Sequence, residues 1–342
     1  MSSVPNGTGN NVASSPLKAT PTMSFLPNVA SSSLKTTTPI MSSQLSNGGN
    51  NVASGAIGNG SSTSESELLS FQRFFEHWIV EQNKYLQDLI SASKHHEQAA
   101  NASTMAAESK DRADRDEVRI TDKPHFRPLI DQVIQHYEQY YQAKSRCAKH
   151  DAIGVLKAPW TSALENAFMW IGGWRPSMAF HLLYSKSGQQ TEEKLASFFQ
   201  GTSSRGDLGD LSPSQLSKVD ELQRRTIREE REITEKMAKH QETVADSAMV
   251  ELSHAVTELI RSEGEGQSSG GIEKERVESV LALKEEGLEK ILLRADDLRL
   301  RTLKEILAVF TPIQAVHFLT AAAELHLRLH DWGMKKDVTA GH

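Results

Sequence analysis

Hydrophobic residues recur every three or four positions along most of the chain after residue 65, the spacing that places them on one face of an α-helix. The stretches with this spacing cover residues 71–89, 128–149, 212–261, 273–310 and 311–333. No stretch of useful length alternates apolar and polar residues as a half-buried strand would. The pattern therefore predicts an all-α protein, an antiparallel multi-helix bundle with long helices and both short and long connections.

A tryptophan-rich segment from 159 to 184 is expected to form a buried helical hairpin. Ser162 and Glu165 have the spacing of a capping box, so a helix should begin at residue 163. The Gly172-Gly173 pair can adopt positive φ and end that helix. Pro176 then suits the start of the next helix, because proline is tolerated in a first turn. Burial of its tryptophans would by itself explain the apolar character of this segment.

The stretch 212–261 reads as one long helix, opened by a capping box of Ser212 and Gln215. A sustained heptad repeat there would predict a coiled-coil homodimer. Glu230 and His240 interrupt the apolar seam, which favours a long helix within one chain. The homodimer stays open as an alternative.

Segments without periodicity divide the chain. Residues 1–64 are rich in Ser, Asn, Thr, Gly and Pro with two lysines as their only charges, so they predict a disordered tail. A transit peptide would also be Ser-rich and free of acids, but the absence of arginine argues against one. The helical domain should span 65–335, with a polar insertion at about 93–124 and a flexible break at about 263–271, before a short tail at 336–342.

Charge and composition exclude several functions. A net charge of −6 argues against a general binder of nucleic acid, which should be basic. The single cysteine, Cys147, rules out an internal disulfide and fits a reducing compartment. No apolar run is long enough for a membrane span. We expect no enzymatic activity, because the chain has no Gly-rich phosphate loop, G-x-S-x-G or His-Glu-x-x-His motif.

The string LENAFMWIGGWRPS at 164–177, with Pro159-Trp160 before it and HLLY after it, resembles the seed dormancy control domain. That domain occurs in the delay-of-germination family and, C-terminal to a basic zipper, in plant TGA transcription factors. Further matching strings are FQRFFEHWIVEQNKYLQDL, LSPSQLSKVDELQ, ADDLRLRTLKEIL and TPIQAVHFLTAAAELHLRLHDWG. The resemblance covers roughly residues 67–335. No basic zipper precedes it, which favours the delay-of-germination branch.

The resemblance implies a non-enzymatic regulator in the nucleus, and also in the cytoplasm as a further location, that acts in transcription-linked control of dormancy and germination and in abscisic acid signalling. It would dock protein partners such as clade A protein phosphatase 2C or transcription factors. A DNA-binding regulator of TGA type is the alternative. Calmodulin is a further candidate partner, although the aromatic helix 71–89 is less basic than its usual targets. The family motif residues expected in the core are Trp160, Glu165, Trp170, Gly172, Gly173, Arg175 and Pro176.

His326 and His330 lie four residues apart, so they share one face of the last predicted helix. Two histidines are too few for zinc, but one is enough to ligate haem iron. LHLRLHDWG resembles the stretch of the delay-of-germination family whose histidines are associated with haem binding. Both histidines are therefore candidate haem ligands in a haem-binding sensor. A purely structural role beside the apolar face of the helix is the alternative.

We predict that residues 1–64 are dispensable for folding, because they offer almost no apolar surface to bury. A chain truncated to 65–342 should keep the helical circular dichroism and the melting temperature of the full chain. A large loss of either quantity would contradict this boundary.

Overall fold

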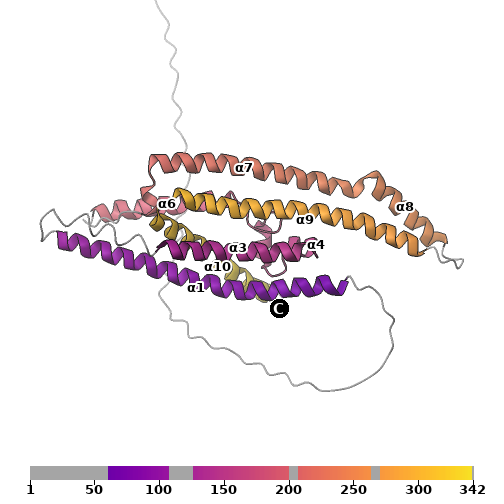
Figure 1. Ribbon diagram of the computed structural model, residues 1–342, viewed down its shortest axis with the longest axis horizontal. Coiled ribbons are helices and arrows are strands. Elements are labelled where there is room, and N and C mark those ends of the chain that lie inside the picture. Colours follow the sequence, from indigo (N-terminus) through magenta and orange to yellow (C-terminus); the bar gives the residue numbers. More distant parts are fainter. Residues whose placement is uncertain (1–60, 108–125, 200–206, 263–269, 341–342) are drawn as a thin grey trace, which may run out of the picture. The chain divides into compact units, whose positions relative to one another are not determined.

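The computed structural model describes residues 61–107, 126–199, 207–262 and 270–340. Every regular element within these ranges is helical, and none is a strand, so the predicted all-α class is confirmed (Figure 1). The predicted tail lies outside the described residues up to position 60, as do most of the polar insertion and most of the break near 263–271. No helix in the described part of the chain is long and apolar enough to cross a membrane.

The long helices are α1 (Ser61–Ala107), α3 (Phe126–Ala148), α6 (Met178–Phe199), α7 (Pro213–Glu242), α8 (Ser247–Ser262), α9 (Gly270–Val309) and α10 (Pro312–Ala340). Two short helices, α4 (Ala152–Lys157) and α5 (Ala163–Phe168), lie between α3 and α6. Single 3-10 turns cover Leu208–Asp210 and Thr243–Ala245.

Packing between these helices follows their apolar faces. α7 lies along α9, and α1 lies against α3 and α10 (Figure 1). Phe180, Leu183 and Phe318 are buried in the largest core cluster, where α6 and α10 meet α1, α3 and α7. An aromatic cluster built on Trp78 and Trp160 joins the first half of α1 to the segment after α3. The described interior thus consists of separate hydrophobic clusters, and α10 contributes its buried apolar residues to the largest of them.

The hairpin begins as predicted, but its helix ends earlier: α5 stops at Phe168 with Met169 as its C-cap, so Gly172 turns the loop that follows and does not end the helix. Ser162 accepts a hydrogen bond from the backbone of Glu165 while the Glu165 carboxylate accepts one from the backbone of Ser162, which completes the capping box. Gly172 has φ +65°, and a β-carbon there would lie 3.1 Å from a methyl group of Leu292. Glycine at this position therefore provides both the left-handed backbone and the close approach of the loop to α9.

A buried ionic clasp holds the loop of the hairpin against α3 and α9. Lys144 donates to the Asp296 carboxylate at 2.9 Å and to the backbone oxygen of Gly172 at 2.7 Å. Arg299 binds the same carboxylate and donates to the backbone oxygens of three loop residues, Trp170, Ile171 and Trp174. Each of these carbonyls thereby has a partner, which a buried polar group requires.

Three further predicted helix boundaries are wrong. The segment 93–107, predicted as part of a loop, continues α1, because its alanine, glutamine and glutamate residues favour helix even without an apolar stripe. The predicted helix 212–261 breaks at Thr243–Ala245, where Asp246 accepts from the backbone of Met249 and Lys284 binds both Asp246 and the oxygen of Thr243. Thr191-Glu192-Glu193 has the pattern of a cap followed by first-turn acids, which predicts a short separate helix, but no helix begins there.

Thr191 lies inside α6, and its hydroxyl donates to the backbone oxygen of Ser187 one turn earlier rather than capping a new helix. Glu230, which interrupts the apolar seam of α7, is buried in the structure. Its carboxylate accepts from the backbone of Ser177 at 2.5 Å and pairs with Arg175 at 3.1 Å. Glu230 interrupts the apolar seam of α7 because it binds the hairpin of the same chain at this point.

Replacing Arg299 by Ala should destabilise the protein by about 3–5 kcal/mol, because three buried carbonyls and one carboxylate lose partners together. Arg294→Ala on the same helix is the matched control, since Arg294 forms a single surface pair with Glu232 and should cost about 1 kcal/mol or less. Urea unfolding followed by circular dichroism measures both changes. Equal losses in the two variants would show that the clasp does not stabilise the fold.

Candidate ligand-binding site

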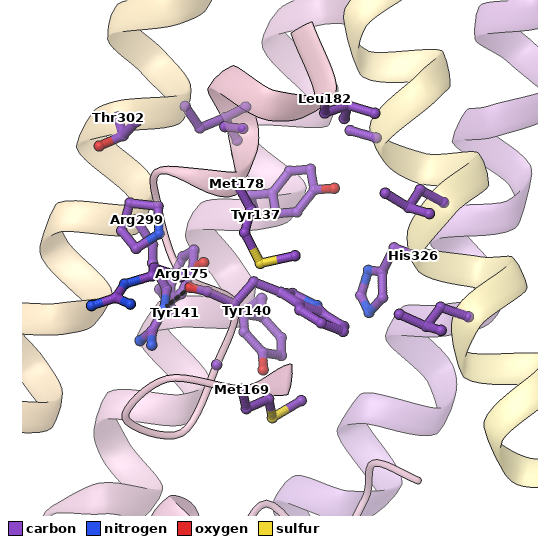
Figure 2. Close-up of a pocket in the computed structure, with 18 of the residues that line it drawn as sticks. Tyr137, Tyr140, Tyr141, Met169, Arg175, Met178, Leu182, Arg299, Thr302 and His326 are labelled. Carbon is purple, nitrogen blue, oxygen red and sulfur yellow. Dashed lines mark hydrogen bonds between the residues drawn. The ribbon is translucent and has the colours of Figure 1, made fainter. Parts of the chain in front are cut away.

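A cavity of about 660 Å³ lies inside the bundle, between α1, α3, α6, α9, α10 and the loop of the hairpin (Figure 2). Its volume falls within the range of about 300–1,000 Å³ that is usual for small-molecule sites. Aromatic, methionine and aliphatic side chains form most of the lining, among them Phe75, Trp78, Tyr140, Trp174, Met169 and Met178. The cavity is therefore a mainly apolar chamber of the size of a ligand site.

One wall of the cavity is polar. Tyr141 and Lys144 reach it from α3, and Arg299 and Thr302 reach it from α9 (Figure 2). Burial lowers the pKa of Lys144 to about 8, although the carboxylate of Asp296 opposes that shift. Burial also raises the pKa of Tyr141 well above 10, so its hydroxyl keeps its proton at neutral pH.

His326 lies on the opposite side of the cavity (Figure 2). Its ring centroid is 5.6 Å from that of Trp78 and 6.2 Å from that of Trp174. Burial lowers the pKa of His326 to about 4, so the imidazole is neutral at pH 7 and keeps a lone pair. No hydrogen bond to this ring is seen among the described residues. His326 can therefore accept a bond from a ligand or coordinate a metal in it.

His330, the other candidate, lies outside the lining of the cavity. Its Nδ1 is 2.9 Å from a carboxylate oxygen of Glu165, which also accepts from the backbone and the hydroxyl of Ser162. Burial raises the pKa of Glu165, but the bonds from His330 and Ser162 outweigh it and lower that pKa overall. Sequence spacing put both histidines on one helical face, yet the structure gives them different surroundings.

The structure places the family motif residues in three kinds of environment. Trp160, Glu165, Gly172 and Pro176 are buried, and Trp170 and Gly173 are half-buried. The Trp170 ring lies between the guanidinium groups of Arg175 and Arg299, and its indole donates to Thr234. Arg175, predicted in the core, has a side chain that is 44% exposed, because only its Nε reaches the buried Glu230.

Sequence reasoning missed the polar wall. Lys144 stands in an ordinary polar-apolar stretch, and Asp296 and Arg299 are flanked by the similar pair Asp297 and Arg301, which forms a surface ion pair instead. Only a comparison of their positions around the helix axis could have separated the buried pair, Asp296 and Arg299, from the surface pair, Asp297 and Arg301. No sequence signal shows that Lys144 faces a carboxylate 152 positions away.

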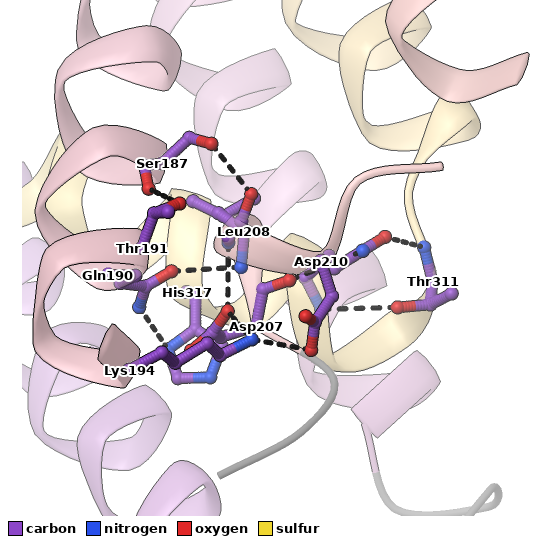
Figure 3. Close-up of polar contacts among 11 residues, drawn as sticks. Ser187, Gln190, Thr191, Lys194, Asp207, Leu208, Asp210, Thr311 and His317 are labelled. Carbon is purple, nitrogen blue, oxygen red and sulfur yellow. Dashed lines mark hydrogen bonds and ion pairs between the residues drawn. The ribbon is translucent and has the colours of Figure 1, made fainter. Parts of the chain in front are cut away.

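A second polar network fixes the turn before α7 (Figure 3). Lys194 binds Asp207 at 2.7 Å and Asp210 at 2.5 Å, and Gln190 accepts from the backbone of Leu208 at 2.8 Å. Gln190 also contacts Nδ1 of His317 at 3.5 Å. These groups bind each other, so we interpret the network as structural. Within the described ranges, no three His, Cys, Asp or Glu side chains are placed to hold a metal ion.

The fit of haem can be judged from these contacts. Haem takes an imidazole lone pair from the protein and apolar surroundings for its ring. His326 meets both requirements, because it is neutral and lies on the wall of an apolar cavity. His330 does not meet the second requirement, because it lies outside the lining of the cavity, although only its Nδ1 contacts Glu165. The residues present therefore fit haem through His326 alone.

The fold and the cavity define an all-helical protein with one candidate ligand site among the described residues, and comparisons with known proteins give its family. A family model described as seed dormancy control matches residues 106–185. Protein DOG1-like 3 of Arabidopsis thaliana is 33% identical over 61% of this chain and 72% of its own length. Protein DOG1-like 4 of the same plant is 30% identical over 78% of this chain and 93% of its own length.

The chain belongs to the DOG1-like family of seed dormancy control proteins. Similarity extends to Transcription factor TGA2 of Arabidopsis thaliana, which is 26% identical over 78% of this chain and 64% of its own length. The resemblance to both groups that the sequence motifs indicated is therefore confirmed.

A buried histidine should make the stability of the protein sensitive to acid. His136 stacks on Trp78 with ring centroids 4.5 Å apart, and burial lowers its pKa to about 4. The unfolded chain, with a histidine pKa near 6.5, then binds more protons than the folded chain between pH 6.5 and 4. The free energy of unfolding should therefore fall as pH drops, by on the order of 2 kcal/mol from pH 6.5 to 4.5.

Urea unfolding at a series of pH values measures this slope. His136→Phe should remove the His136 contribution to this slope while keeping the stacking on Trp78, and the contribution of His326, whose pKa burial also lowers to about 4, should remain. His254→Gln, a change at an exposed histidine of α8, should leave the slope as in the parent. A parent whose stability does not change between pH 6.5 and 4.5 would show that His136 binds its proton normally in the folded state.

Proposed function

We propose that this protein is a non-enzymatic regulator of seed dormancy and germination that acts by docking protein partners. Membership of the DOG1-like family carries the proposal, because the similarity spans 72% and 93% of two relatives rather than one short motif. Relatives named as transcription factors support a regulatory role and a nuclear location. The partners proposed from the family resemblance are clade A protein phosphatases 2C or transcription factors in abscisic acid signalling, and calmodulin is a weaker candidate.

Direct DNA binding is the alternative, since one relative is the TGACG-sequence-specific DNA-binding protein TGA-2.1 of Nicotiana tabacum. This chain spans 45% of that protein's length. Sequence-specific binding by a basic zipper needs a basic helix to neutralise phosphates and to reach base edges. Residues 1–64 hold two lysines and no arginine, and the chain has a net charge of −6. We therefore propose that any association with DNA is indirect.

The two alternatives give opposite results with the purified full chain. A clade A protein phosphatase 2C should bind it in a calorimetric titration, whereas electrophoretic shifts at ~150 mM salt should show duplex DNA binding no tighter than ~10⁻⁴ M. Binding that depends on the DNA sequence at nanomolar protein would favour the TGA-type function. A lack of binding to both phosphatase and transcription factors would contradict the docking proposal.

A haem-dependent sensor is the second candidate function, and the position of His326 favours it. His326 would hold haem through its imidazole, and the group would supply an iron centre. The chain itself would keep that imidazole neutral and surround it with the rings of Trp78 and Trp174. His330 would take no part in ligation, because it lies outside the lining of the cavity.

Replacing His326 alone by Ala should abolish the Soret shift that haem produces on titration, while the helix content stays intact because alanine favours helix. His330→Ala is the matched control on the same helix. It should keep the Soret shift and lose roughly 2–3 kcal/mol of stability, because Glu165 is left buried without one of its partners. An unchanged spectrum in a folded His326→Ala variant would exclude His326 as the ligand.

A further inference from the structure

The polar wall of the cavity has two cationic side chains that share a single carboxylate. Lys144 and Arg299 both line the wall, and both bind the single carboxylate of Asp296. Two cations and one anion leave a net charge of +1. Arg175, the remaining cation of the lining, is already paired with Glu230. Because a buried net charge is costly, an anion that enters the cavity would be attracted to this wall.

The same wall has hydrogen-bond donors to spare. An ammonium group has three N–H donors, and Lys144 directs two of them to Asp296 and Gly172. The Tyr141 hydroxyl is a protonated donor, and within the described part of the chain it has no hydrogen-bond acceptor. Arg299 is different, since four of its five N–H donors are bound to Asp296 and to loop carbonyls, so it contributes mainly charge. Lys144 and Tyr141 therefore offer this wall two donors, and a carboxylate has two oxygens that accept.

The remainder of the cavity is suited to a flat apolar body. The rings of Trp78 and Trp174 lie 5.6 Å and 6.2 Å from that of His326, and the backbone oxygen of Trp174 accepts from Arg299, so Trp174 reaches from the polar wall toward His326. The thioethers of Met169 and Met178 line the space between the polar wall and His326. Aromatic rings and methionine sulfur pack favourably against other aromatic rings. A ligand that reaches from one side to the other thus has a charged end and an aromatic body.

From these observations we propose that the cavity binds an aromatic monocarboxylate, with its carboxylate at Tyr141 and Lys144 and its rings between the side chains that surround His326. This inference rests on the proposal that the cavity is the ligand site of a sensor. It differs from the haem candidate in its recognition residues, because carboxylate binding depends on Tyr141, whereas iron ligation depends on His326.

The probe is 2-naphthoate, compared with its uncharged methyl ester, in calorimetric titrations of the full chain. Quenching of tryptophan fluorescence provides a second readout, because Trp78 and Trp174 line the cavity. We expect the acid to bind at least about tenfold more tightly than the ester, the effect of one hydrogen bond to a charged group. Equal affinities, or no binding of the acid at millimolar concentration, would overturn the proposal.

Two variants locate the bound probe. Tyr141→Phe keeps the ring and should weaken binding of the acid about tenfold without weakening that of the ester, whereas Tyr184→Phe, at a half-exposed tyrosine bound to Gln223 outside the cavity, should change neither. Ala322→Phe places a ring in the cavity and should abolish binding of both probes while circular dichroism stays unchanged. Unchanged binding in folded Tyr141→Phe or Ala322→Phe would overturn the assignment.

The haem titration and the 2-naphthoate titration test the haem candidate and the carboxylate site independently. Binding of 2-naphthoate that depends on Tyr141, together with a parent that gives no Soret shift, supports the carboxylate site and rejects haem. A Soret shift that depends on His326, in a parent that does not bind 2-naphthoate, rejects the carboxylate site and supports haem. Docking of a phosphatase is measured without either ligand, so its outcome is independent of both.

Discussion

The buried clasp of Lys144, Asp296 and Arg299 is the interaction on which the hairpin and the cavity both depend. A loop that turns through Gly172 exposes several backbone oxygens toward the interior, where water does not reach them. Arg299 is suited to this position because its guanidinium presents several donors in a fixed plane, and a single carboxylate and three carbonyls use them. Lysine at 299 would satisfy fewer of these oxygens.

The clasp also explains why an apolar bundle keeps an open chamber. α3 and α9 are joined through side chains that span the distance between them, and the hairpin loop is fixed at its edge. A purely apolar contact would allow these helices to close onto each other, because dense packing is the favoured state of a core. The polar bonds hold the loop and both helices at fixed positions, so the space between Tyr141 and His326 persists.

Much of the fold could be predicted because its signals are local. Helical spacing, the capping box at Ser162 and the glycine pair each act within a few residues, and the structure contains the helices and the hairpin that they indicate. The errors in helix boundaries arose where the same short sequence pattern is compatible with two local structures. Thr191 resembles a cap but bonds to the turn before it, and Thr243–Ala245 breaks a helix because Lys284, 38 residues beyond Asp246, stabilises the break.

The site could be predicted only in part, because its chemistry depends on distant neighbours. The spacing of His326 and His330 correctly places them on one helix, but spacing carries no information about what each imidazole meets. Glu165 of α5 contacts the ring of His330, whereas the rings of Trp78 and Trp174 lie beside the ring of His326. Two identical side chains one turn apart thus differ in their surroundings: His330 contacts the carboxylate of the hairpin's Glu165, whereas His326 lines the cavity.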